Sequence, residues 1–261
     1  MGILEIVIAV VAGLLMGFSM GTVGGGGAIL AVPVLVYGLH QSPLQATTGS
    51  LIVVGATAVL GAAIAGRQGR LNLKQGLLFG ATAIVGSSLG AWTAHFVPET
   101  ILMACFAALM VVTAVTMVRR LVVGRATDAE TDERQNPLLL VVLATVVGFL
   151  TGFLGVGGGF MIVPALTLVL GVSMRKASGT SLVVIAISCA AALVTRLVSA
   201  PDHVQPHWPS IAVLTGVAVV GLGLGAAPAR KANNRQLSIG FAVLVCGVAL
   251  YTLSQAIPAL V

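Results

Sequence analysis

Long apolar runs separated by short polar segments occupy almost the whole chain. The runs cover about residues 3–22, 28–40, 44–66, 75–97, 100–118, 137–154, 159–172, 177–199, 208–228 and 236–256. Most of them approach the roughly 20 residues that an α-helix needs to cross a bilayer. The pattern predicts an all-α polytopic membrane protein with 8–10 hydrophobic segments, which form a single membrane domain over residues 1–261.

The hydrophobic runs form two sets of five that share a sequence signature. The stretch G-G-G-G-A-I-L-A-V-P at residues 24–33 returns as G-V-G-G-G-F-M-I-V-P at residues 155–164. Pro33 and Pro164 are 131 positions apart, and no gap is needed to align the residues around them. Internal duplication in an apolar chain is typical of membrane transporters.

Five segments per repeat would place the second half upside down relative to the first. We divide the chain into repeat one (1–120), a cytoplasmic linker (121–136) and repeat two (137–261). When the segments cross in alternating directions, all but one of the 13 Lys and Arg residues fall on one side, and Arg196 is the exception. Basic loops face the cytoplasm. The sequence therefore predicts two inverted-topology repeats with both chain termini outside.

Each repeat is expected to be a glycine-turn helix hairpin followed by three transmembrane helices. The second hairpin arm, from Gly27 to His40, would be about 20 Å long as a helix, against a hydrocarbon core of about 30 Å. The arm from Gly158 to Gly171 has the same length. We expect hairpins that enter from opposite faces, with both turns at one depth near or beyond the midplane. The first arm, residues 3–20, is long enough to cross, so full crossing stays open.

Local signals mark one helix start and two helix contacts. Ser42, Pro43 and Gln45 form a serine N-cap, a proline at the first helical position and a glutamine at the third. The motifs Gly86-x-x-x-Gly90 and Gly221-x-x-x-Gly225 are spaced as in helices that pack closely in membranes. We expect each motif to lie in a seam between two helices.

Composition excludes several classes of protein. Hydrophobic residues make up 58% of the chain and charged residues 8%, whereas about a quarter of a soluble domain is charged. The net charge of +6 comes from loop residues that set orientation, so it does not indicate a nucleic-acid partner. No H-E-x-x-H or G-x-S-x-G motif is present, and the glycine runs lack the Lys-Ser/Thr of a phosphate-binding loop. The three cysteines and four histidines show no metal-ligand spacing. We expect no catalytic residues, no cofactor, no metal and no enzyme activity.

Anion chemistry is concentrated at the two glycine turns. Glycine lets the backbone approach a ligand closely, and helices that begin near Ala28 and Gly159 would point their positive dipole ends at the turns. Nearby hydroxyl groups and Arg196 would add hydrogen bonds and a positive charge. The candidate substrate-binding residues are Gly24, Gly25, Gly26, Gly27, Thr48, Ser50, Gly155, Gly157, Gly158, Gly159, Thr180, Ser181 and Arg196.

A structural alternative applies to each of these residues. The glycines would also serve tight helix packing. The hydroxyl groups would also bond back to the preceding turn of their own helices. The Arg196 side chain would also extend to the outer membrane interface without contacting a substrate.

The same residues carry a resemblance to a known family. The chain resembles the TauE/SafE family of sulfite-exporter-like membrane proteins, through G-x-x-G-x-G-G-G-F-x-x-V-P at residues 152–164 and A-S-G-T-S-L at residues 177–182. Degenerate copies lie at residues 21–33 and 46–51. The resemblance implies transport, usually export, of sulfite or small organosulfonates across a bacterial inner membrane. Repeat one has Ala28 in place of Gly159, so the two half-sites need not contribute equally.

These observations predict a secondary transporter of small sulfur-containing anions, with alternating access around a midplane site formed by the two glycine turns. An ion channel and a membrane assembly factor without transport activity are the alternatives. All seven acidic residues fall in loops or at segment ends, which argues against a carboxylate proton relay. The expected partners are the anion and the lipid bilayer. A coupling cation, H⁺ or Na⁺, and a homodimer stay open.

Overall fold

The described secondary-structure elements are helical. A computed structural model describes residues 2–122, 137–155, 159–169, 171–199, 206–231 and 233–260. Its long helices are α1 (Ile3–Val23), α3 (Pro43–Arg67), α4 (Leu73–Thr93), α5 (Glu99–Val122), α6 (Pro137–Leu154), α8 (Met174–Ser199), α9 (Trp208–Lys231) and α10 (Asn234–Leu260). Six of them, namely α1, α3, α4, α5, α8 and α9, are long and apolar enough to cross a membrane. The prediction of an all-α polytopic membrane protein is confirmed.

The second arm of each hairpin is short and irregular. In repeat one it consists of a 3₁₀ segment (Gly25–Leu30), the single turn α2 (Ala31–Pro33) and a π-helical turn (Val34–Gly38). In repeat two it consists of α7 (Gly159–Pro164) and a π-helical turn (Ala165–Val169). Both π-helical turns directly follow a proline, which restricts the backbone there and lacks an N–H donor. Helix α1 is long enough to cross the membrane, whereas the second arm, Gly25–Gly38, is shorter than a span.

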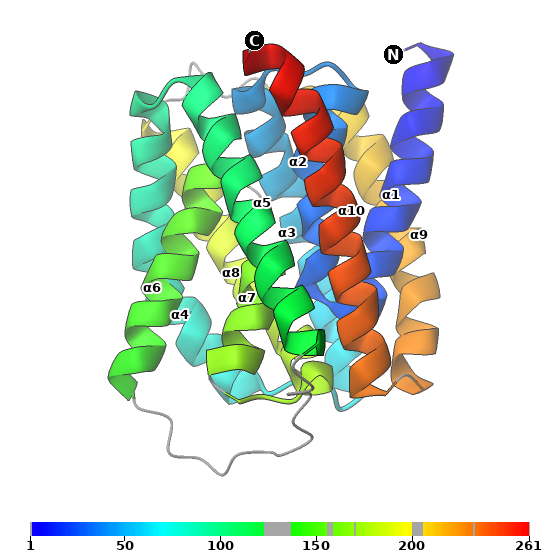
Figure 1. Cartoon of the computed structure of the whole chain (residues 1–261), viewed down its shortest axis with the longest axis vertical. Helices are drawn as coiled ribbons and strands as arrows, with labels where there is room; N and C mark the ends of the chain where they lie inside the picture. The colour runs from blue at the N-terminus through cyan, green and yellow to red at the C-terminus, as the bar shows by residue number, and fades with distance from the viewer. Residues whose placement is uncertain are drawn as a thin grey trace.

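The two ends of the bundle differ in what they contain. Helix α1 begins and α10 ends at one end, which we call the terminal end (Figure 1). Helix α5 ends and α6 begins at the opposite end, which we call the linker end (Figure 1). Corresponding helices α1 and α6 therefore start at opposite ends. The orientation of the repeats across the membrane, with the termini outside, stays a prediction, and linker residues 123–136 lie outside the described residues.

The helices pack reciprocally between the two repeats. Helix α1 packs along α9 and α4 packs along α6, while α3 packs against α8 and α5 against α10. In the sequence repeat, α1 corresponds to α6 and α4 corresponds to α9. Each helix of repeat one thus has its main partner in repeat two, so the hairpins and the cores of both repeats are interlocked.

Glycines form the seams between the reciprocal pairs. A Cβ atom at Gly86 would overlap the backbone carbonyl of Thr145 in α6, and one at Gly225 would overlap the carbonyl of Phe18 in α1. Gly90 and Gly221 are equally close to the same two helices. The seams predicted from the two G-x-x-x-G motifs are confirmed, because only a residue without a Cβ permits this backbone approach.

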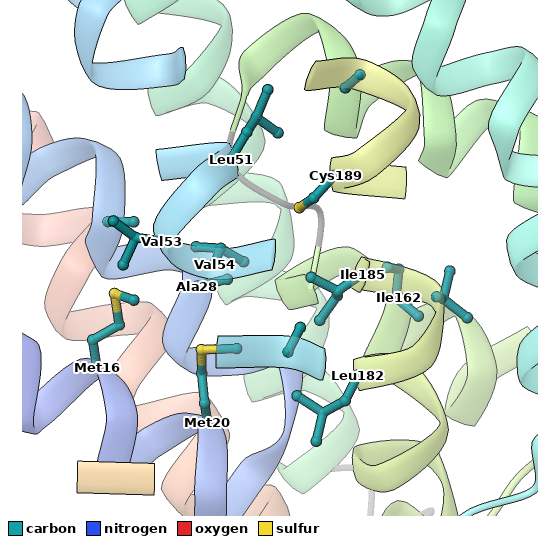
Figure 2. Packing of buried hydrophobic residues seen from close by; sticks show 14 of the residues in the cluster. Met16, Met20, Ala28, Leu51, Val53, Val54, Ile162, Leu182, Ile185 and Cys189 are labelled. Carbon is teal, nitrogen blue, oxygen red and sulfur yellow. The ribbon is translucent and has the colours of Figure 1, made fainter. Parts of the chain in front are cut away.

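An apolar layer fills the middle of the bundle. The side chains of Val53 and Val54 from α3 and of Ile185 from α8 are completely buried, and Figure 2 shows them together with Met16 and Met20 of α1. Large apolar side chains also cover the outside, as expected for a surface that faces lipid: examples are Val85 at 59% and Val112 at 58% exposure. Inside the bundle, buried polar and charged side chains occur at a limited number of positions among these apolar residues.

Candidate functional site

Each hairpin turns at a glycine whose backbone no other residue fits. Gly24 has φ 76° and Gly155 has φ 63°, values that L-residues rarely adopt. A Cβ atom at Gly24 would overlap the backbone of Ser178, and one at Gly155 would overlap Thr47. Gly24 and Gly155 are 131 positions apart, and so are Thr47 and Ser178. The two turns are therefore seated on equivalent positions of α3 and α8.

A serine from the other repeat bonds to each glycine turn. Ser50 of α3 donates to the carbonyl oxygen of Gly155, and the N–H of Gly25 donates to the hydroxyl oxygen of Ser181, at 3.2 Å. Ser181 also donates to the Ser178 carbonyl oxygen in its own helix, at 2.9 Å. The structural alternative, in which the hydroxyl group bonds to the preceding turn of its own helix, is therefore observed for Ser181. The serines additionally tie each hairpin to the opposite repeat.

The two glycine runs meet, although their turns do not lie at one depth. The backbones of Gly25 and Gly159 are in direct contact. Gly24, however, lies beside Ser178 near the start of α8, whereas Gly155 lies beside the start of α3. These positions are toward opposite ends of the bundle. The expectation of a common depth was wrong because the first hairpin arm runs past the middle before it turns.

The other glycines divide between packing and undescribed positions. Gly26 faces the ring of Phe241 in α10, and Gly27 packs on the backbone of α1. Both contacts are those expected if these glycines serve tight helix packing and not substrate binding. Gly157 and Gly158 lie outside the described residues.

Arg196 is the centre of a polar cluster at the terminal end. Its side chain is completely buried, so it does not extend to the membrane interface as the alternative predicted. Nη1 donates to the hydroxyl groups of Thr47 and Thr48, at 2.7 and 3.0 Å, and Nη2 donates to the Gly152 carbonyl oxygen, at 3.3 Å. Nε is buried and has no hydrogen-bond partner among the described residues. Among the described residues, no carboxylate pairs with this guanidinium group.

Thr180 does not join a comparable cluster. Its hydroxyl oxygen accepts the backbone N–H of Asn72, at 3.0 Å, and so contacts the loop before α4. Thr48 and Thr180 looked equivalent as candidate anion donors, but only Thr48 contacts a buried cation. The cluster residue Thr47 was not among the binding candidates, because sequence depth alone could not distinguish it from its neighbours.

Arg70 is a further buried cation, although the sequence placed it only among the basic loop residues that set orientation. Only 3% of Arg70 is exposed. Its Nε donates to Oε1 of Gln68, at 2.8 Å, and its Nη2 lies 3.5 Å from the carbonyl oxygen of Gly21. A signal was present, because Gly69 marks a helix C-terminus at which the chain turns back.

The described residues contain no cluster of three or more His, Cys, Asp or Glu side chains able to bind a metal ion. What the site offers is a set of neutral hydrogen-bonding groups around buried guanidinium groups. Such an environment suits an anion, because charge-assisted hydrogen bonds are strong where water is excluded.

Comparisons with known proteins identify a matching family and several similar proteins. The sequence model of the family described as "Sulfite exporter TauE/SafE" matches residues 9–252. A probable membrane transporter protein from Xylella fastidiosa (strain 9a5c) is 30% identical over 258 residues, which cover 97% of each chain. The probable membrane transporter YunE of Bacillus subtilis (strain 168) is 27% identical over 90% of this chain and 92% of its own. No solved structure matches the chain.

Proposed function

Because the chain belongs to the TauE/SafE family of membrane proteins, we propose that it is a secondary transporter that exports sulfite or a small organosulfonate across a bacterial inner membrane. The family and the names of its relatives support a membrane transporter that is not an enzyme. The sulfur-containing substrate and the direction rest on the family description and on the anion chemistry of the site.

The observation that carries this proposal is that the buried charge of Arg196 has no carboxylate partner among the described residues. An arginine buried among transmembrane helices is costly unless an anion balances it. Its described partners are hydroxyl groups and a carbonyl oxygen, and its Nε has none. A guanidinium group presents its N–H groups in a planar fork that matches two oxygens of a sulfite or sulfonate group. We infer that the substrate supplies the missing negative charge.

The contacts between the halves suggest how access would alternate. The hydrogen bonds from Ser50 and to Ser181 join each glycine turn to the other repeat. A rocking motion of one repeat against the other would break these contacts at one end and keep them at the opposite end. Coupling to H⁺ or Na⁺, a homodimer, and termini outside the cell remain parts of this proposal.

Transport by purified protein in liposomes tests the proposal. We expect wild-type protein to move radiolabelled sulfite or methanesulfonate with saturable kinetics. Replacing Arg196 with Gln should lower the initial rate at least about 30-fold, because a buried charged hydrogen-bond partner of the anion contributes roughly 2–5 kcal/mol. Arg196→Lys should retain part of the activity, since it keeps the charge and loses the fork.

The exposed Arg67 provides the matched control. Arg67→Gln removes the same charge from α3 and should leave the rate within about twofold, because exposed charges are largely screened. Folded wild-type protein that moves no sulfur-containing oxyanion would contradict the proposal. Flux that does not saturate would favour the channel, and loss of a cellular phenotype without any flux would favour the assembly factor.

A further inference from the structure

A second buried arginine occupies the position at the linker end that corresponds to the Arg196 cluster. Nη2 of Arg196 donates to the carbonyl oxygen of Gly152, and Nη2 of Arg70 lies 3.5 Å from the carbonyl oxygen of Gly21. Gly21 and Gly152 are 131 positions apart. Both guanidinium groups therefore approach the same position of the first hairpin arm, one in each repeat.

Arg70 reaches this position from a loop, whereas Arg196 belongs to a helix. The α3 residue that corresponds to Arg196 is Ala65, 131 positions earlier. After α3, Gly69 has φ 66°, the N–H of Arg70 donates to the Ala65 carbonyl oxygen at 3.0 Å, and the N–H of Gly69 donates to Gly66 at 3.1 Å. These bonds form a Schellman motif, which turns the chain back at the end of a helix. The turn brings the Arg70 side chain back to the bundle.

The charge of Arg70 has only neutral partners among the described residues. They are the Gln68 side-chain oxygen and the Gly21 carbonyl oxygen. Burial, and to a smaller extent the nearby guanidinium group of Arg175, lowers the pKa of Arg70 below its ordinary value. The protein thus holds a second positive charge in an environment that disfavours it, and a bound anion would offset that cost.

The two arginines are separated by the apolar layer. From Thr47, which contacts Arg196, to Arg67 at the end of α3 is about 30 Å by helix rise. Between these levels lie Val53, Val54 and Ile185, all completely buried (Figure 2). Besides these apolar side chains the layer holds the buried hydroxyl groups of Thr57 and Ser188 but no charged group among the described residues, so an anion would occupy it at a cost. Among the described residues, Lys and Arg side chains belong to the two ends of the bundle, and none comes from the residues at this level.

We propose that Arg70 is a second anion-binding residue, which contacts the small oxyanion at the linker end as Arg196 contacts it at the terminal end. This inference rests on the proposed function, because it assigns a second position on the same transport path. The anion would exchange between two cationic positions as the repeats move. At each position, the guanidinium group contacts the carbonyl oxygen of the equivalent glycine in a hairpin arm.

Side-specific kinetics distinguish this role from a structural one. Protein is reconstituted in liposomes sorted by orientation, and the half-saturating sulfite concentration is measured from each face with saturating sulfite on the other. We expect Arg70→Gln to raise the half-saturating concentration about tenfold or more at the linker face, because that is the effect of losing a hydrogen bond to a charged group. At the terminal face the same substitution should change it less than about twofold. Arg196→Gln should show the opposite asymmetry. Arg67→Gln, one turn earlier in the chain and exposed, should change neither value.

Two further results decide between the outcomes. Arg70→Lys should recover part of the lost affinity at the linker face, because it restores the charge, and each variant must elute and melt as folded protein. If wild-type protein transports sulfite but Arg70→Gln lowers only the maximal rate, or shifts both faces equally, Arg70 is a structural residue and the inference is wrong. If wild-type protein moves no sulfur-containing anion, the proposed function fails first.

Discussion

The terminal end and the linker end of the bundle are built on equivalent backbone positions but carry their positive charge differently. At the terminal end, Arg196 extends from the last turns of α8 and donates to Thr47 and Thr48. At the linker end, the position equivalent to Thr48 is Gly179, where a Cβ atom would overlap the carbonyl oxygen of Arg70. The glycine makes room for the loop that supplies the second arginine.

This difference shows what duplication preserves and what it leaves free. The hairpin glycines and the serines that contact them are 131 positions apart in the two repeats, and the G-x-x-x-G seams recur at 135 positions. The residue that provides the charge does not: a helix provides it at one end and a Schellman turn provides it at the other. Position in space, rather than position in the repeat, is what the two arginines share.

The largest expected effect is a loss of folded protein, and it should be the same for the hairpin turns of both repeats. Replacing either Gly24 or Gly155 with Ala should prevent recovery of folded protein. Each substitution places a side chain at a positive φ and overlaps a neighbouring helix, at Ser178 or Thr47, so the combined cost should exceed about 3 kcal/mol. Elution profiles and melting curves in detergent measure the outcome.

A glycine with free space around it controls for the glycine-to-alanine change itself. Gly223 is exposed in α9, and nothing lies within 4 Å of a Cβ placed there. Gly223→Ala should be neutral or stabilise the protein by up to about 1 kcal/mol. If Gly24→Ala melts like Gly223→Ala, the tight seating of the hairpin turn on α8 is wrong.

A smaller effect, of opposite sign, is expected at the terminal end alone. Arg196→Met should raise the melting temperature of the substrate-free protein, by an amount equivalent to about 1–2 kcal/mol, because it removes a buried charge that has no carboxylate partner among the described residues, while keeping much of the volume. The same variant should no longer be stabilised by added sulfite, since a ligand raises apparent stability only when it binds. A lower melting temperature would show that the charge already has a partner.

Asp202 supplies the control for that possibility, because it is the acidic residue closest to Arg196 in the sequence. Asp202→Asn should change neither the melting temperature nor the stabilisation by sulfite. If Asp202→Asn destabilises the protein as an ion-pair mutation would, the missing negative charge belongs to the chain and not to the substrate.

Much of the fold was predictable because it depends on local chemistry. Apolar run lengths gave the spans, and the start of α3 followed from Ser42, whose side chain accepts the N–H of Gln45 at 3.4 Å. The helix seams followed from the G-x-x-x-G spacing. Lipid as the solvent makes these signals strong, because a span must be apolar and must satisfy its own backbone.

The site was less predictable because it depends on which groups tertiary packing brings together. Arg196 was identified as the one basic residue on the opposite side from the others, yet its burial against Thr47 needed the α3–α8 contact. Arg70 was counted only among the basic loop residues that set orientation. The burial of Arg70 depends on the turn at the neighbouring Gly69 and on the approach of Gly21 from α1. The contact with Gly21 joins residues far apart in the sequence, so the local pattern around Arg70 does not predict it.

The smallest expected effect compares the two serines that contact the hairpin turns. Ser181→Ala leaves the N–H of Gly25 buried without its acceptor, whereas Ser50→Ala removes one donor to the Gly155 carbonyl oxygen. An unpaired N–H is the costlier loss, since a carbonyl oxygen without a full set of partners is better tolerated. We expect Ser181→Ala to destabilise the protein by about 1–2 kcal/mol and Ser50→Ala by about 1 kcal/mol or less. Melting curves of the two single variants and the double variant measure both costs, and the opposite order would mean that the hairpin of repeat two depends more on its serine than the hairpin of repeat one.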